Sequence, residues 1–146
     1  RSVNYYLIMI TPDINYLAVL VAAVASMVIG FLFYGPLFGK FWIALMGFTK
    51  EQLDAGKAKG MSKSYALGFL GSLVTSYVLA RFVAYTGAGG ISGGLQTGFW
   101  AWLGFVATVA LGSILWEGKS WKLYGLNMGY QFMNLLAMGA ILAVWQ

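Results

Sequence analysis

Apolar residues along the chain fall into four long blocks separated by short polar or glycine-rich segments. The blocks cover about residues 14–34, 64–85, 95–116 and 123–145. A helix needs about 20 apolar residues to cross the ~30 Å hydrocarbon core of a bilayer, and each block has that length. The pattern therefore predicts an all-α integral membrane bundle of four transmembrane helices at residues 14–146, preceded by an N-terminal extension at residues 1–13.

Helix-start and helix-stop signals lie at the borders of these blocks. Thr11-Pro12-Asp13 is typical of a helix start, and Gly35-Pro36 predicts the end of the first span because proline disfavours helical geometry in the residue before it. Residues 35–63 read as a polar interfacial loop, in which Thr49 and Gln52 have the spacing of a capping box. The glycine-rich segment 86–94 predicts a flexible turn between the second and third spans.

Positive charges are concentrated on one side of the predicted bundle. With four spans, the loops after the first and third spans share a side, and the only other cations are Arg1 and Arg81. The positive-inside rule then makes the lysine-rich loops cytoplasmic and both termini external, in what we expect to be a bacterial inner (plasma) membrane. The lysines concerned are Lys40, Lys50, Lys57, Lys59, Lys63, Lys119 and Lys122.

Composition narrows the possible chemistry. The chain has no cysteine, no histidine and only four acidic residues, so thiol, imidazole and zinc chemistry have no side chains to act through. We therefore expect no enzyme activity, no metal site and no cofactor. The net charge of +5 does not point to nucleic acid, because the cations lie in loops between apolar blocks rather than on a basic face.

The first and third spans resemble each other without gaps at an offset of 82 residues. Residues 25–34 then lie over residues 107–116, and Gly39-Lys40-Phe41-Trp42 is echoed by Gly118-Lys119-Ser120-Trp121. The second and fourth spans align more weakly at an offset of 59. Together these similarities predict a duplicated helical hairpin whose pseudo-twofold axis runs along the membrane normal.

Small residues recur at four-residue spacing in both members of the repeat. Such stripes let helices approach closely in a membrane, and we expect them to pack within or between subunits. Lysine and tryptophan at the two echoed corners suit headgroup anchors. The packing candidates are Ala22, Ser26, Gly30, Gly104, Thr108 and Gly112, and the interfacial anchors are Lys40, Trp42, Lys119 and Trp121.

A stripe of amides in the fourth span is the strongest functional signal. Asn127, Gln131 and Asn134 recur at helical spacing, and Ser72 and Thr75 occupy the corresponding face of the second span. Amides in a membrane need polar partners, so these groups either bond between helices or line a hydrated path for a small solute.

Arg81, near the end of the second span, has two interpretations as well. It either extends to the external headgroups or contacts an anion.

The segments NYLAVLVAAVASMVIGFLFYGPLFGKFW and AWLGFVATVALGSILWEGKSWKLYGLNMGYQFMNLLAMGAILAVW resemble a family of small bacterial membrane proteins, the domain of unknown function 1761. The resemblance covers about residues 14–146, and Tyr34-Gly35-Pro36-Leu37-Phe38-Gly39-Lys40 is its most specific part. It implies a four-helix membrane protein and brings no activity or functional residues.

Two functions fit these observations. One is a small-solute or ion pathway formed by a homo-oligomer, lined by the amides with Arg81 at its outer mouth. The other is a structural, lipid-organising or accessory subunit of a membrane complex. Both have the lipid bilayer as a partner, and self-association is expected because one small subunit has little room for an enclosed path.

Overall fold

A computed structural model describes residues 12–146, so residues 1–11, which make up most of the predicted extension, lie outside the described residues. The described residues are helical throughout, apart from short connections, and contain no strand. In chain order the helical elements are α2 (Tyr16–Leu32), the π-helical turn η1 (Phe33–Leu37), α3 (Gly39–Met46), α4 (Lys50–Lys59), α5 (Ser62–Thr86), α6 (Gly90–Ala101), the π-helical segment η2 (Trp102–Ala107), α7 (Thr108–Ala110), α8 (Gly112–Leu115) and α9 (Trp121–Val144).

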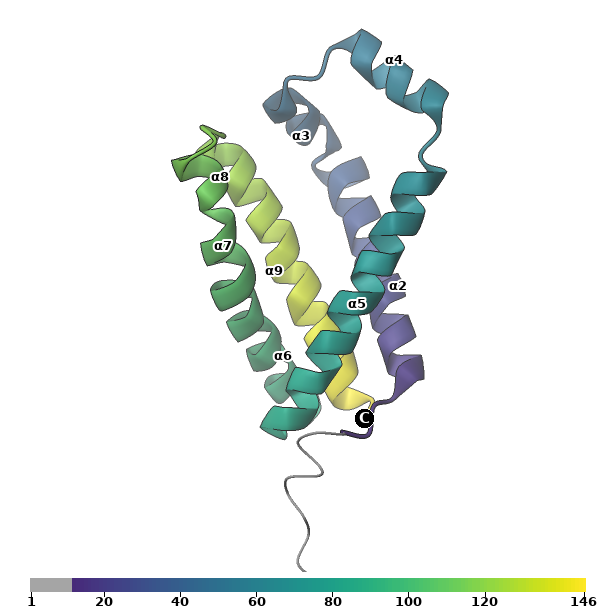
Figure 1. Ribbon diagram of the computed structural model, residues 1–146, viewed down its shortest axis with the longest axis vertical. Coiled ribbons are helices and arrows are strands. Elements are labelled where there is room, and N and C mark those ends of the chain that lie inside the picture. The colour runs from purple at the N-terminus through teal and green to yellow at the C-terminus, as the bar shows by residue number, and fades with distance from the viewer. Residues whose placement is uncertain (1–11) are drawn as a thin grey trace, which may run out of the picture.

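The elements form two helical hairpins that converge at one end (Figure 1). One hairpin is α2 with α5, joined through α3 and α4; the other is the continuous α6–α8 helix with α9. The end that carries α3, α4 and the α8–α9 turn is called the lysine side, and the end that carries the α5–α6 turn and the end of α9 is called the turn side. The hairpins lie apart at the lysine side and come together at the turn side.

The first helix begins and ends differently from the sequence prediction. Its N-cap is Asn15, whose side-chain oxygen accepts hydrogen bonds from the backbone N–H groups of Leu17 and Ala18, so the predicted start at Thr11-Pro12-Asp13 is wrong. Pro36 does not end the helix. It lies within the π-helical turn η1, where the wider turn accommodates a residue that has no N–H to donate, and the span continues to Leu37.

The connection between α2 and α5 is helical rather than extended. α3 begins at Gly39, where a Cβ atom would lie 2.8 Å from the carbonyl oxygen of Tyr34, so the close turn after η1 requires glycine. The predicted capping box at the start of α4 is confirmed: the Thr49 hydroxyl accepts from the Gln52 N–H at 3.1 Å, and the Gln52 side chain accepts from the Thr49 N–H at 2.9 Å.

The glycine-rich segment 86–94 is not a flexible turn throughout. α6 begins at Gly90, because the glycines beyond it make the closest helix contact in the fold. A Cβ atom at Gly94 would collide with the carbonyl oxygen of Gly139, and one at Gly98 with that of Leu135. Glycine therefore brings the backbones of α6 and α9 into direct contact, which stabilises a helix that glycine propensity alone disfavours.

The buried core occupies the turn-side half of the bundle. It includes Ala18 and Ala22 of α2, Leu79 and Val83 of α5, and Met138 of α9, each at most 2% exposed. The Ser76 hydroxyl donates to the Val19 carbonyl at 2.8 Å and joins α5 to α2 within this half. Toward the lysine side, buried residues become sparse, so the bundle is closed at one end only.

Three helices of the described chain are long and apolar enough to cross a membrane: Tyr16–Leu37, Ser62–Thr86 and Gly90–Leu115. They correspond to the first three predicted spans. α9 matches the fourth in position and is 24 residues long, but it is less apolar because Asn127, Gln131 and Asn134 lie along it. It is also the helix with the most buried residues, so protein rather than lipid covers much of its surface.

Candidate functional site

A cavity of about 920 Å³ lies between the two hairpins at the lysine side. Its mouth is open, since Met46 and Met61 are 41% and 48% exposed, and its deepest residues lie next to the buried core. The size is within the range of pockets that hold small organic molecules. The lining residues are Met27, Gly30, Phe31, Tyr34, Gly35, Trp42, Met46, Met61, Tyr65, Ala110, Ser113, Lys119, Leu123, Tyr124, Asn127, Met128, Tyr130 and Gln131.

Amide and phenol groups form the deep part of the cavity. The Tyr34 hydroxyl of η1 donates to the Asn127 side-chain oxygen of α9 at 2.7 Å, which links the two hairpins across the cavity. Gln131 lies one helical turn further along α9. Tyr130 reaches α2, where its hydroxyl would lie 3.0 Å from a Cβ atom at Gly30. The small residue at position 30 therefore makes room for the phenol.

Apolar side chains make the walls between this deep part and the mouth. The rings of Trp42 and Tyr34 pack edge to face, with their centroids 5.6 Å apart. Four of the seven methionines of the chain line the cavity, and they come from α2, α3, α9 and the N-cap of α5: Met27, Met46, Met61 and Met128. Because methionine is unbranched and flexible, such walls adapt to ligands of different shape.

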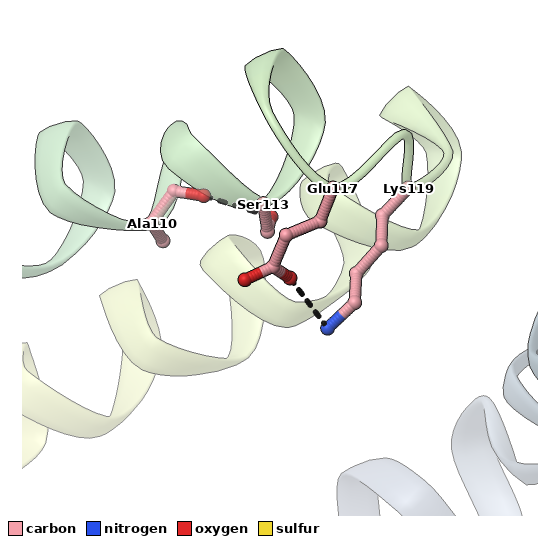
Figure 2. Close-up of polar contacts among 4 residues, drawn as sticks. All are labelled: Ala110, Ser113, Glu117 and Lys119. Carbon is pink, nitrogen blue, oxygen red and sulfur yellow. Dashed lines mark hydrogen bonds and ion pairs between the residues drawn. The ribbon is translucent and has the colours of Figure 1, made fainter.

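The mouth of the cavity carries one charged lining residue, Lys119. Its ammonium group lies 3.3 Å from a carboxylate oxygen of Glu117, and the two side chains extend from the α8–α9 turn and meet beside it (Figure 2). Nearby, the Ser113 hydroxyl donates its hydrogen bond to the Ala110 carbonyl of the preceding helical turn at 2.8 Å (Figure 2). Lys119 is 57% exposed and Glu117 61%, so the ion pair is weak and the lysine remains available to a ligand.

Asn134 completes the amide stripe but does not line the cavity. It is 5% exposed, and its side-chain oxygen has no hydrogen-bond partner among the described residues. An unpaired buried acceptor costs about 1–3 kcal/mol, and native proteins rarely retain one without a reason. The stripe therefore divides: Asn127 and Gln131 face the cavity, whereas Asn134 lies buried in the closed half.

The predicted partners on α5, Ser72 and Thr75, lie apart from the amides of α9. Ser72 lies 3.3 Å from the hydroxyl of Ser26 and 3.7 Å from the sulfur of Met27, so it bonds to α2 rather than to α9. Thr75 is exposed and lines a separate apolar groove between α5 and the third span. The structure thus brings Asn127 and Gln131 together and leaves Ser72 and Thr75 outside the cavity.

Arg81 lies on α5 towards the turn side, well away from the cavity. Its guanidinium donates to the hydroxyl of Tyr77 at 3.0 Å and to that of Tyr85, and it lies over both rings at 5.7 and 5.3 Å. Two tyrosines of its own helix therefore hold its position.

The two small-residue stripes lie in different surroundings. In the first, Ala22 and Ser26 are buried between α2 and its neighbours, at 0% and 2% exposure. In the second, Gly104 has open space where a Cβ atom would lie, and Thr108 is exposed, so neither packs against another helix of the described chain.

The four predicted headgroup anchors, which lie at the two similar Gly-Lys-x-Trp segments, do not share one environment. Trp42 and Lys119, one from each corner, line the cavity. Their counterparts do not: Lys40 is exposed and Trp121 is 63% exposed. Sequence reasoning overlooked Tyr34 and Tyr130 as site residues. Tyr130 follows Asn127 at a spacing of three, which places it near the same helix face, and this spacing was the signal available in the sequence.

No group of histidine, cysteine, aspartate or glutamate side chains within residues 12–146 is arranged to hold a metal ion. Among the described residues, the lining of the cavity offers amide and hydroxyl groups, apolar walls and one cation.

Comparison with known proteins places the chain in a family. The family model described as "Protein of unknown function (DUF1761)" matches residues 17–143. The chain belongs to this family. A UPF0591 membrane protein of Schizosaccharomyces pombe is 31% identical over 91 residues, which are 61% of this chain and 62% of that relative, so the match spans less than two thirds of the relative. No solved structure matches the chain. With its apolar helices, the DUF1761 protein is a membrane protein.

Proposed function

We propose that this DUF1761 protein is a membrane carrier subunit, in which the cavity at the lysine side is the binding site for a small solute. The observation that carries the proposal is the combination of an open end and a closed end along one amide stripe. Asn127 and Gln131 line a cavity of about 920 Å³, while Asn134 lies in the closed half, where its oxygen has no hydrogen-bond partner within residues 12–146. A carrier needs such a one-sided site, whereas a channel needs a continuous path.

The proposal includes a motion of the two hairpins. Glycine contacts make α6 and α9 a rigid pair, and the hairpins meet mainly through small or flexible side chains such as Ala22 and Met138. Rocking one hairpin against the other would close the lysine side and open the turn side, which exposes Asn134 to the solute and gives its oxygen a partner. Alternating access in known transporters uses this kind of movement.

We further propose that α9 is a fourth span, that the lysine side is cytoplasmic in a bacterial inner membrane, and that the hairpins arose by duplication. In support, the Gln146 side chain donates to the Ala88 carbonyl at 2.9 Å, so α9 reaches the same end as the α5–α6 turn. The loops that carry most lysines lie at the other end of the bundle, one on each hairpin. The first and third spans keep their gapless similarity over residues 25–34 and 107–116.

Self-association belongs to the same proposal. Gly104 and Thr108 are exposed, and with Gly112 they have the spacing that brings membrane helices together. A second subunit against this face would add helices around a bundle that is small for a carrier. The proposal assigns no catalytic residue to the chain.

Cysteine labelling tests alternating access without knowledge of the solute, since the chain has no cysteine of its own. Gln131→Cys in sealed vesicles of both orientations is treated with a membrane-impermeant maleimide. We expect rapid labelling from the lysine side, because position 131 lines the open cavity, and slower labelling from the turn side through the minor, oppositely open state. Labelling rates are read by mass shift on gels.

Three further single-cysteine variants serve as controls. Ala55→Cys on α4 should react only from the lysine side and Gln146→Cys only from the turn side, which also reports whether α9 crosses the membrane. Phe132→Cys should resist labelling from both sides, because position 132 packs against Phe99 and Trp102 within the second hairpin. Absence of turn-side labelling at Gln131→Cys under all conditions would contradict a carrier and favour a static structural or lipid-organising bundle.

A further inference from the structure

The chemistry of the cavity indicates which class of solute it takes, an inference that rests on the proposed binding site. Among the described residues that line the cavity, none is acidic and Lys119 is the only charged one. A cationic ligand would therefore meet a like charge and no counter-charge within the lining of the cavity. A ligand with a negative charge would meet the Lys119 ammonium. Glu117 lies outside the lining, 3.3 Å from that ammonium, but both side chains are more than half exposed, so the ion pair is weak and a ligand carboxylate can compete for the lysine.

The deep groups favour a ligand that accepts hydrogen bonds. The oxygen of Asn127 already accepts from Tyr34, so this amide keeps two N–H donors and one acceptor lone pair, and its donors outnumber its acceptors. Gln131 adds a second amide, whereas the hydroxyl of Tyr130 is hydrogen-bonded to Ser26 of α2. These donors complement carbonyl or carboxylate oxygens.

The apolar walls of the cavity favour a ligand that has an apolar body in addition to its polar group. Four methionines and the rings of Trp42, Tyr65 and Tyr34 are among the residues that line the cavity. A small hydrophilic anion such as phosphate would leave these walls without contacts, and burying its charge there would be costly. A molecule with a hydrocarbon or aromatic body fills them and gains the hydrophobic contribution of that contact.

We propose that the cavity binds a carboxylic acid with an apolar body, such as an aryl-substituted or medium-chain acid. Its carboxylate contacts Lys119 or the amide donors, and its body packs against the methionines and Trp42. Lys119 determines the sign of the ligand charge, and the methionine walls set a broad tolerance for its shape.

Equilibrium binding of two probes with the same body and opposite charge tests this class. The protein in phosphatidylcholine nanodiscs is titrated with 4-phenylbutyrate and with 4-phenylbutylamine, and binding to protein-free nanodiscs is subtracted. We expect saturable binding of the acid with a Kd at least about tenfold lower than that of the amine, since Lys119 attracts one probe and repels the other. Lys119→Gln should raise the Kd of the acid about three- to fivefold, because an exposed charge contributes modestly.

Two variants make the test specific. Lys40→Gln removes the lysine at the equivalent corner, which does not line the cavity, and should change the Kd of the acid less than twofold. Asn127→Asp keeps an acceptor for the Tyr34 hydroxyl and adds a negative charge in the cavity, so it should reverse the preference toward the amine.

The outcomes separate this inference from the carrier proposal, because binding needs no transport. Equal affinity for acid and amine would overturn the assignment of the solute class. So would the absence of saturable acid binding to a protein whose Gln131→Cys variant is labelled from the lysine side. If the protein binds the acid but the Gln131→Cys variant is never labelled from the turn side, the assignment of the ligand class holds and the carrier proposal is wrong.

Discussion

Gly98→Ala is expected to lower the thermal unfolding temperature of the DUF1761 protein by several degrees. A methyl group at this position would collide with the carbonyl oxygen of Leu135, and backbone cannot rotate aside as a side chain does. Overpacking of this kind costs about 1–3 kcal/mol or more, which corresponds to roughly 2–4 °C per kcal/mol for a chain of this size. Circular dichroism of the purified protein in mild detergent measures the shift.

Gly129→Ala is the matched control, because position 129 lies within α9 and has no neighbouring atom where a Cβ would be added. Alanine has the higher helix propensity, so this variant should be more stable than the parent by up to about 1 kcal/mol. The same substitution thus has opposite signs at the two positions. Unchanged stability of Gly98→Ala would show that α6 and α9 are not in backbone contact.

This glycine contact illustrates what the sequence could not predict. The length and apolar character of residues 14–34, 64–85 and 95–116 suffice to predict three spans, because lipid imposes the same length on each. The segment 86–94 has the composition of a turn, and only its fit against Gly139 makes part of it helical. Tertiary contact therefore decides the border of α6, and a single sequence does not reveal which helix lies opposite.

The candidate site was predictable in part, for a related reason. Amide side chains in a membrane span predict a functional or packing site because they need polar partners. Two of the three amides of the stripe do line the cavity. The partner of Asn127 on the first hairpin is Tyr34, not the hydroxyl of Ser72 or Thr75, because the hairpins diverge at the lysine side and η1 lies opposite Asn127. Periodicity identifies the face of a helix, but it does not give the angle between two hairpins.

The divergence is the reason why we propose a carrier rather than a structural bundle. A bundle made only for structure would gain stability by closing both ends, since apolar contacts are the main force available between hairpins. Here the closed half has side chains such as Ala22 and Met138 at 0% exposure, while the other half surrounds a cavity with polar groups. The loss of contacts at one end is understandable if a ligand occupies that end during the working cycle.

Asn134→Leu is expected to stabilise the protein, by about 1–3 kcal/mol, because it removes a buried side-chain oxygen that has no partner in this conformation. The same variant should slow the carrier cycle, since the proposed function gives Asn134 a role only when the turn side is open. Thermal unfolding measures the first effect, and turn-side labelling of a Gln131→Cys, Asn134→Leu double variant measures the second.

Asn127→Leu should have the opposite effect on stability, although it removes the same group from the same helix face. It takes the acceptor from the Tyr34 hydroxyl and is expected to destabilise the protein by about 1 kcal/mol. Adding Tyr34→Phe to this variant should restore part of the loss, because the unpaired hydroxyl is then absent as well. If Asn127→Leu and Asn134→Leu shifted stability in the same direction, the two amides would share one environment, and the division of the stripe into an open and a closed half would be wrong.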